Sequence, residues 1–173
     1  MKKLRSFTMI ELIVVITVIL VLTGFTIYSL GPARAKSRDA RRITDASLIM
    51  SALGQYHTSN LRTYPTPEVI PPDPIQSDQY YALELVDEDS FADLALSDYM
   101  PSPTFDPINN ADYKYIYLYS GDGKKAAVLV KALESMDRCN TAESINNPEI
   151  VTAYLTDTLA LGSGGEACYY VTQ

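Results

Sequence analysis

The feature that most constrains this chain is its apolar run over residues 7–30, FTMIELIVVITVILVLTGFTIYSL. At about 1.5 Å per residue in a helix, about 20 apolar residues cover the roughly 30 Å hydrocarbon core of a bilayer. Residues 1–6 precede the run and carry three basic side chains, which the positive-inside rule keeps in the cytoplasm. The sequence therefore predicts one membrane-spanning helix, with the N-terminus inside and everything after the span outside.

Glu11 is the anomaly in this run. It is a carboxylate five residues into an apolar segment, with no basic residue beside it in sequence. A charge at the centre of a membrane costs about 2.5 to 3.5 kcal/mol on insertion scales, and less near the end of a span. Glu11 therefore either lies unpaired at the interface, with no role, or meets a cation that another molecule supplies.

The hexapeptide Phe-Thr-Met-Ile-Glu-Leu at residues 7–12, after a short basic leader, resembles the N-termini of type IV pilins and of the pseudopilins of type II secretion. The resemblance implies that a prepilin peptidase cuts between Ser6 and Phe7 and methylates the new amino group of Phe7. One departure from the family pattern is Ser6, because the residue before the cut is normally Gly.

The resemblance also implies a role for Glu11 in assembly. An α-amino group has a reference pKa near 8 and is mostly cationic at neutral pH. A filament can therefore set the amino group of one Phe7 against the Glu11 of a neighbouring subunit. In a low-dielectric helix bundle an unpaired carboxylate is strongly unfavourable, so the pair would select the correct register.

The implied fold is the pilin-like α+β fold, in which a long hydrophobic N-terminal helix packs on a small antiparallel sheet. We divide the chain into a leader (1–6), a transmembrane and filament-core helix (7–31), an amphipathic second half of that helix (32–60) and a globular domain (61–173). Pro32 predicts a kink or local unwinding, since it cannot donate to the carbonyl of Tyr28. Residues 33–35, Ala-Arg-Ala, look like a secretory cleavage site, but the preceding run is too long and contains Glu11.

Helical spacing continues to about residue 58, where an apolar stripe needs a partner surface. The opposite face carries charges that we interpret as solvated, facing lipid headgroups, or set against acidic neighbours in a filament. The stripe consists of Ala40, Ile43, Ala46, Ile49, Met50, Leu53 and Tyr56, and the charged face of Arg34, Lys36, Arg38, Asp39, Arg41, Arg42 and Asp45.

The globular domain begins with a proline-rich loop over residues 61–77. Ser90 and Asp93 predict a capping box for a short helix that ends before Pro101. A β-hairpin is predicted from alternating tyrosines at residues 113–119, a Ser-Gly-Asp-Gly turn and residues 126–133. Residues 169–171 predict a final strand. The tyrosines could bind carbohydrate, but packing against the long helix or a neighbouring subunit is the preferred interpretation.

Residues 61–173 carry 18 acidic and 6 basic side chains, a net charge of −12. A domain with this negative net charge should repel the phosphates of nucleic acids. The two cysteines, Cys139 and Cys168, both follow the span, and an extracytoplasmic location favours a disulfide over two free thiols. Such a disulfide would stabilise the domain by roughly 3 to 4 kcal/mol in the chain-entropy model.

No catalytic constellation stands out, and we expect no enzymatic activity. His57 is the single histidine and has no triad or metal-site companions in sequence, so we interpret it as an exposed or half-packed side chain. Oxygen-bearing side chains flank the hairpin, and hard oxygen ligands suit calcium. Their spacing matches no compact ligand motif and they are also turn residues, so we predict no metal or cofactor and keep Asp106, Asn109, Asp112 and Asp122 as calcium candidates.

The sequence thus favours a structural filament subunit, a pilin or pseudopilin. Its implied partners are copies of itself in a helical filament, the prepilin peptidase, an inner-membrane assembly platform with its ATPase, and membrane lipids. It would be a single-pass precursor in the cytoplasmic membrane and then part of an extracellular pilus or pseudopilus. The alternatives are a minor or tip pilin that acts as an adhesin or DNA-binding module, a subunit of a type II secretion pseudopilus, and an anchored enzyme.

Overall fold

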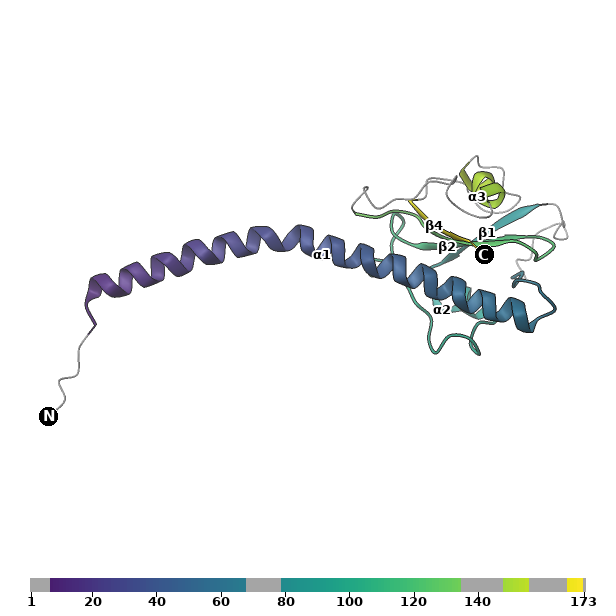
Figure 1. Ribbon diagram of the computed structural model, residues 1–173, viewed down its shortest axis with the longest axis horizontal. Helices are drawn as coiled ribbons and strands as arrows, with labels where there is room; N and C mark the ends of the chain where they lie inside the picture. The colour runs from purple at the N-terminus through teal and green to yellow at the C-terminus, as the bar shows by residue number, and fades with distance from the viewer. Residues whose placement is uncertain (1–6, 68–78, 135–147, 156–167, 173) are drawn as a thin grey trace. The chain divides into compact units, whose positions relative to one another are not determined.

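The computed structural model describes residues 7–67, 79–134, 148–155 and 168–172, without the side chains of residues 25–30, 148 and 169–172. The fold is α+β, with a small antiparallel sheet and helices (Figure 1). The chain divides into two compact units, Met1–Ser37 and Arg38–Gln173. The elements are α1 (Met9–Ser59), β1 (Tyr80–Leu85), α2 (Glu88–Ala92), β2 (Tyr115–Ser120), β3 (Ala126–Val130), α3 (Pro148–Leu155) and β4 (Tyr169–Thr172).

The helix α1 is 51 residues long and includes Pro32. The backbone stays helical through this position, so of the two predicted alternatives, a kink or local unwinding, the unwinding is wrong. A proline inside a helix removes one intrahelical hydrogen bond, and here this loss does not end the helix. Among the residues that the structure describes, no helix is both long enough and apolar enough to cross a membrane.

In the second unit, the predicted apolar stripe of α1 forms the core contact. Ala46, Ile49, Met50 and Leu53 are buried in one cluster with β2 and β3 side chains, and Ile43 and Tyr56 pack against that cluster. Ala40, by contrast, is exposed, so its assignment to the stripe is wrong.

Three charged residues that were assigned to the face opposite the stripe are buried as well. Asp39, Arg42 and Asp45 are buried, which corrects the prediction that they lie on a solvated face. The sequence Asp39, Arg42, Ala46, Ile49, Leu53 follows the three-and-four spacing of one helix face. Their burial depends on partners distant in sequence, which the local pattern could not reveal.

The sheet has the order β1-β2-β3-β4 with antiparallel neighbours throughout. The β2–β3 hairpin and the final strand β4 confirm the sequence prediction, with Tyr117 opposite Val128 in the hairpin. The edge strand β1 was missed, because its sequence YYALEL contains the good helix formers Ala, Leu and Glu and shows no polar alternation.

Both faces of β2 are buried. Tyr115, Tyr117 and Tyr119 lie in the cluster that includes the α1 stripe, which confirms helix packing for these tyrosines over a carbohydrate platform. Ile116 and Leu118 point the other way and pack with Ile150, Val151 and Tyr154 of α3. Figure 1 shows α3 over the face of the sheet opposite the C-terminal part of α1. The helix α3 was not predicted from the sequence.

The short helix α2 starts earlier than predicted. Its N-cap is Asp87, whose carboxylate accepts from the Ser90 N–H at 2.9 Å, while Ser90 Oγ accepts from the Asp87 N–H at 3.3 Å. The expected box of Ser90 and Asp93 is therefore wrong. Serine is a favoured N-cap residue, but here Asp87 is the N-cap and Ser90 is the third helical residue.

Two stacked tyrosines of β2 give a matched test of core packing. The hydroxyl of Tyr117 donates to the Pro65 carbonyl at 2.8 Å, while that of Tyr119 is buried and has no hydrogen-bond partner in the described part of the chain. Burial raises the pKa of Tyr119 to about 12. A buried unsatisfied hydroxyl costs about 1 to 3 kcal/mol, and a net hydrogen bond contributes about 1 kcal/mol.

We therefore predict that Tyr119→Phe raises the free energy of unfolding by about 1 kcal/mol and that Tyr117→Phe lowers it by about the same amount. Urea unfolding of the full-length protein, followed by circular dichroism, measures both. Equal destabilisation by the two substitutions would show that the Tyr119 hydroxyl is satisfied in solution.

Candidate functional site

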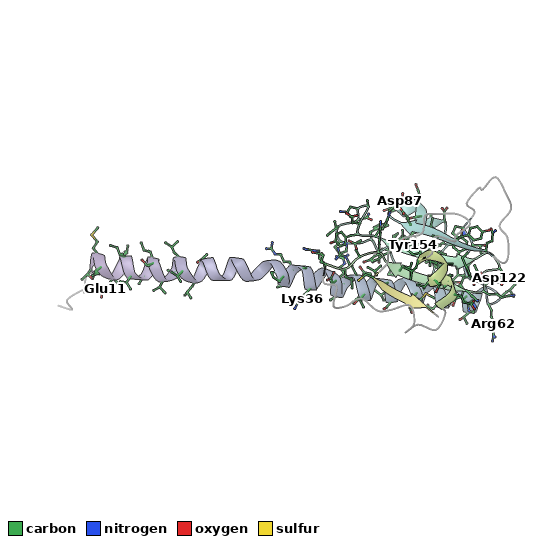
Figure 2. The ribbon with its side chains drawn as sticks, turned by 90° about the horizontal axis from the view of Figure 1, so that it is seen from above. Glu11, Lys36, Arg62, Asp87, Asp122 and Tyr154 are labelled. Atoms are coloured by element: carbon green, nitrogen blue, oxygen red, sulfur yellow. The ribbon has the colours of Figure 1, made fainter. Side chains whose placement is uncertain are left out.

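The first unit presents an apolar surface. Its large apolar side chains are between 47% and 83% exposed, and in Figure 2 side chains stand out from both edges of the helix in the region labelled Glu11. They are Phe7, Met9, Ile10, Leu12, Ile13, Val14, Val15, Ile16, Val18, Ile19, Leu20, Val21 and Leu22. Soluble monomers rarely expose contiguous apolar patches above a few hundred Å², and covering apolar area yields about 25 cal/mol per Å². Large exposed apolar surfaces are typical of protein–protein or membrane interaction sites.

Glu11 lies at the start of α1 in a capping box with Thr8. The Thr8 N–H and hydroxyl both donate to Glu11 Oε2, at 2.9 and 2.8 Å, and the Glu11 N–H donates to Thr8 Oγ1 at 3.3 Å. Each side chain thus satisfies a backbone donor at the helix terminus. This role of Thr8 was not predicted, although Thr-x-x-Glu before an apolar run is the sequence signature of a capping box.

The geometry leaves part of the Glu11 carboxylate available. Both Thr8 bonds end on Oε2, and within the described residues no hydrogen bond reaches Oε1. Phe7 directly precedes the cap and is 82% exposed. Ser6, the other side of the predicted cleavage point, lies outside the described residues. An additional donor can therefore approach Glu11 without displacing the helix cap.

A second polar constellation, which we call the Arg42 cluster, consists of Arg38, Asp39, Arg42, Asp106 and Glu134. The Arg42 side chain is fully buried. Its guanidinium contacts both oxygens of Asp106, at 2.7 and 3.2 Å, and donates to Asp39 at 2.8 Å and to Glu134 at 3.0 Å. The cluster therefore joins α1 to the loop that contains Asp106 and to the chain just after β3.

The remaining contacts complete the Arg42 cluster. Arg38 makes a two-bond contact with Glu134, at 2.7 and 2.6 Å, and the Glu134 N–H donates to Asp39 at 2.9 Å. The Tyr113 ring covers the Arg42 guanidinium, 4.4 Å from its centroid. Because every charge here already faces an opposite charge, the cluster is suited to anchoring α1.

The pKa values in the cluster reflect this pairing. Burial by itself disfavours the Arg42 cation, but hydrogen bonds to Asp106, Glu134 and Asp39 outweigh it and raise the Arg42 pKa. Hydrogen bonds from Arg38, supported by those from Arg42, lower the pKa of Glu134 to about 2. Both groups therefore stay charged near neutral pH.

The calcium candidates are engaged in separate contacts. Asp106 binds Arg42 and accepts from the Ile108 N–H, Asn109 donates to the Val86 carbonyl, and the Asp112 N–H donates to Asn110. Asp122 accepts from Ser120 and from the Lys124 N–H in the β2–β3 turn. No group of three or more His, Cys, Asp or Glu side chains that could hold a metal ion occurs among the described residues.

The other predicted residues also have definite surroundings. His57 is half-buried and stacks on Tyr64 with ring centroids 4.4 Å apart, which confirms a half-packed role. Cys168 is buried and disulfide-bonded, and its N–H donates to the Val130 carbonyl. The only other cysteine of the chain, Cys139, lies outside the described residues, so the pairing of the two stays a prediction.

Comparisons of this chain with protein-family models, with curated proteins and with solved structures find no match. The resemblance to pilins and pseudopilins therefore rests on the motif at residues 7–12 and its context.

The Arg42 cluster predicts that replacing Arg42 lowers the free energy of unfolding much more than replacing its neighbour Arg41. Arg42→Ala would leave Asp39 and Asp106 buried without their cation, and breaking a buried pair costs about 3 to 5 kcal/mol. Arg41 is the control, because its side chain is 62% exposed and lies 3.3 Å from Asp45, and such surface pairs contribute about 0 to 1 kcal/mol. Denaturant unfolding of both variants measures the difference. Equal costs would contradict the anchoring role.

The low pKa of Glu134 predicts a dependence of stability on pH. Because its pKa falls from 4.5 to about 2 on folding, ionised Glu134 stabilises the fold above pH 4.5, and this stabilisation is lost as the pH falls towards 2. Glu134→Gln should be less stable than wild type at pH 7 and should lose less stability between pH 5 and 2. Thermal melting across this range tests the prediction, and parallel pH profiles for the two proteins would refute it.

Proposed function

We propose that this chain is the structural subunit of a type IV pilus-like filament, a pilin or pseudopilin that polymerises through its N-terminal helix. The observation that carries the proposal is the exposed apolar surface over residues 7–22, which contains one carboxylate in the first turn of α1. A surface of this kind is covered either by lipid or by equivalent helices of other copies. The subunit moves from the first environment to the second when the filament grows.

Before assembly, the proposal places residues 7–31 in the cytoplasmic membrane, with the basic residues 1–6 inside. The capping box supports this stage, because a carboxylate in an apolar environment is less unfavourable when it is hydrogen-bonded. Thr8 supplies those bonds from within the same helix. A prepilin peptidase then cuts before Phe7, and an assembly platform with its ATPase lifts the subunit out of the bilayer.

During assembly, the new amino group of Phe7 in one subunit pairs with Glu11 of another. Glu11 Oε1 offers the acceptor, since the Thr8 bonds end on Oε2. The Arg42 cluster meanwhile holds the C-terminal part of α1 against the globular body. The role is structural and needs no catalytic group or cofactor, and the acidic body is unsuited to binding nucleic acid.

Three substitutions of Glu11 test the proposal and separate charge from capping. Gln can replace Glu at the third helical residue of a capping box, so Glu11→Gln keeps the hydrogen bond to the Thr8 N–H and removes the charge. Glu11→Ala removes both, and Glu11→Lys reverses the charge. We predict normal amounts of all three proteins in the membrane and at least about tenfold less protein in sheared surface fibres, since each 1.4 kcal/mol changes an equilibrium tenfold.

Abundant fibres from the Gln and Lys variants would contradict the charge-pairing mechanism. Fibres from the Gln variant but not from the Ala variant would assign the requirement to the Thr8–Glu11 cap instead. Immunoblots of sheared and cell-bound fractions distinguish these results, with Thr58→Ser at an exposed position near the C-terminal end of α1 as a control that should assemble normally.

A further inference from the structure

The second unit carries a groove that its own fold leaves open. It lies between α2 and residues 95–103 and has a volume of about 550 Å³. Apolar side chains form much of its lining, to which Glu88 and Asp89 of α2 also belong. The larger apolar lining residues are Phe91, Leu96, Met100, Pro101 and Pro103. The groove is therefore suited to an apolar side chain flanked by positive charge.

The charge around the groove is of one sign. Between Glu84 and Lys114 the sequence contains no basic residue. Glu88, Asp89, Asp93 and Asp98 are exposed, and within the described residues no cation forms a salt bridge with any of them. Like charges in proximity repel one another, so a cationic partner would relieve this concentration of carboxylates.

The outward face of α1 in the same unit has the complementary features. Arg41 is 62% exposed at its side chain and also pairs with Asp45 of the same helix at 3.3 Å, and Leu48 is an apolar residue that is 53% exposed. The two are seven residues apart, which places them on one helix face about 10 Å from each other. Thr44, between them, is also exposed. This face therefore offers one cation and one apolar side chain beside short polar residues.

We infer that the α2 groove of one subunit receives the outward face of α1 from a second copy of this chain. Leu48 of the incoming helix enters the apolar groove, and Arg41 faces Glu88 and Asp89. The contact rests on the proposed function and gives it a second interface, separate from the pairing at Glu11. Because the two surfaces differ, the contact is head-to-tail, and a head-to-tail contact that does not close produces an open helical filament.

A charge exchange in the full-length protein tests this contact. Arg41→Glu alone and the pair Glu88→Lys with Asp89→Lys should each reduce sheared fibre protein at least about tenfold, because like charges set against each other across an interface cost several kcal/mol. The combined triple variant should recover fibres to within about threefold of wild type. Arg62→Glu, an exposed basic position on the same unit, is the control and should assemble normally.

The amount of each variant in the membrane and its thermal melting show whether it folds. A second probe is Leu48→Asp, which should remain folded and also lose fibres. Recovery in the triple variant supports the inference. Normal fibres from Arg41→Glu and from Leu48→Asp would overturn it while leaving the filament function intact, whereas absence of fibres from the wild-type protein would overturn both.

Discussion

Both the fold of the second unit and the proposed filament depend on the covering of apolar surface on α1. In residues 38–59 one face of the helix is covered by the sheet, through Ala46, Ile49 and Leu53. In residues 7–22 apolar side chains are exposed. The burial of apolar surface that folds the second unit is thus left incomplete in the described part of the first unit. The proposed filament would complete it by covering these side chains with equivalent helices of other copies.

Polar groups decide where this apolar helix starts and how it is held. At its beginning, the Glu11 carboxylate accepts from the Thr8 N–H, and the Thr8 hydroxyl accepts from the Glu11 N–H. In the second unit, Arg42 joins Asp39 on the helix to Asp106 and Glu134 far along the chain. Buried ion pairs of this kind add little net stability compared with apolar packing, but a missing partner is costly. They therefore favour one position of the helix on the sheet.

Local patterns in the sequence predicted the elements that local physics determines. The alternating tyrosines of β2 and the turn after them specified the hairpin, and the spacing from Ile43 to Tyr56 specified the buried helix face. The Arg42 cluster was not predictable in this way, because Arg42 and Asp106 are 64 residues apart. Without Asp106 in view, the charged residues of α1 have the same sequence pattern as a solvated helix face. The strand β1 was missed because its sequence contains good helix formers and shows no polar alternation. The helix α3 was missed because the face of β2 that it covers could not be identified from the local sequence. Of the candidate site, Glu11 was identified from its misfit with the apolar run, while Thr8 needed the helix terminus to be located.

Mass spectrometry of the N-terminus of protein from sheared surface fibres would decide whether this chain is a processed filament subunit. We expect this chain to dominate the sample and to begin at an N-methylated Phe7, despite the serine before the cut. Recovery of the chain only from the membrane fraction, with Met1 still in place, would contradict the claim that it is a processed filament subunit.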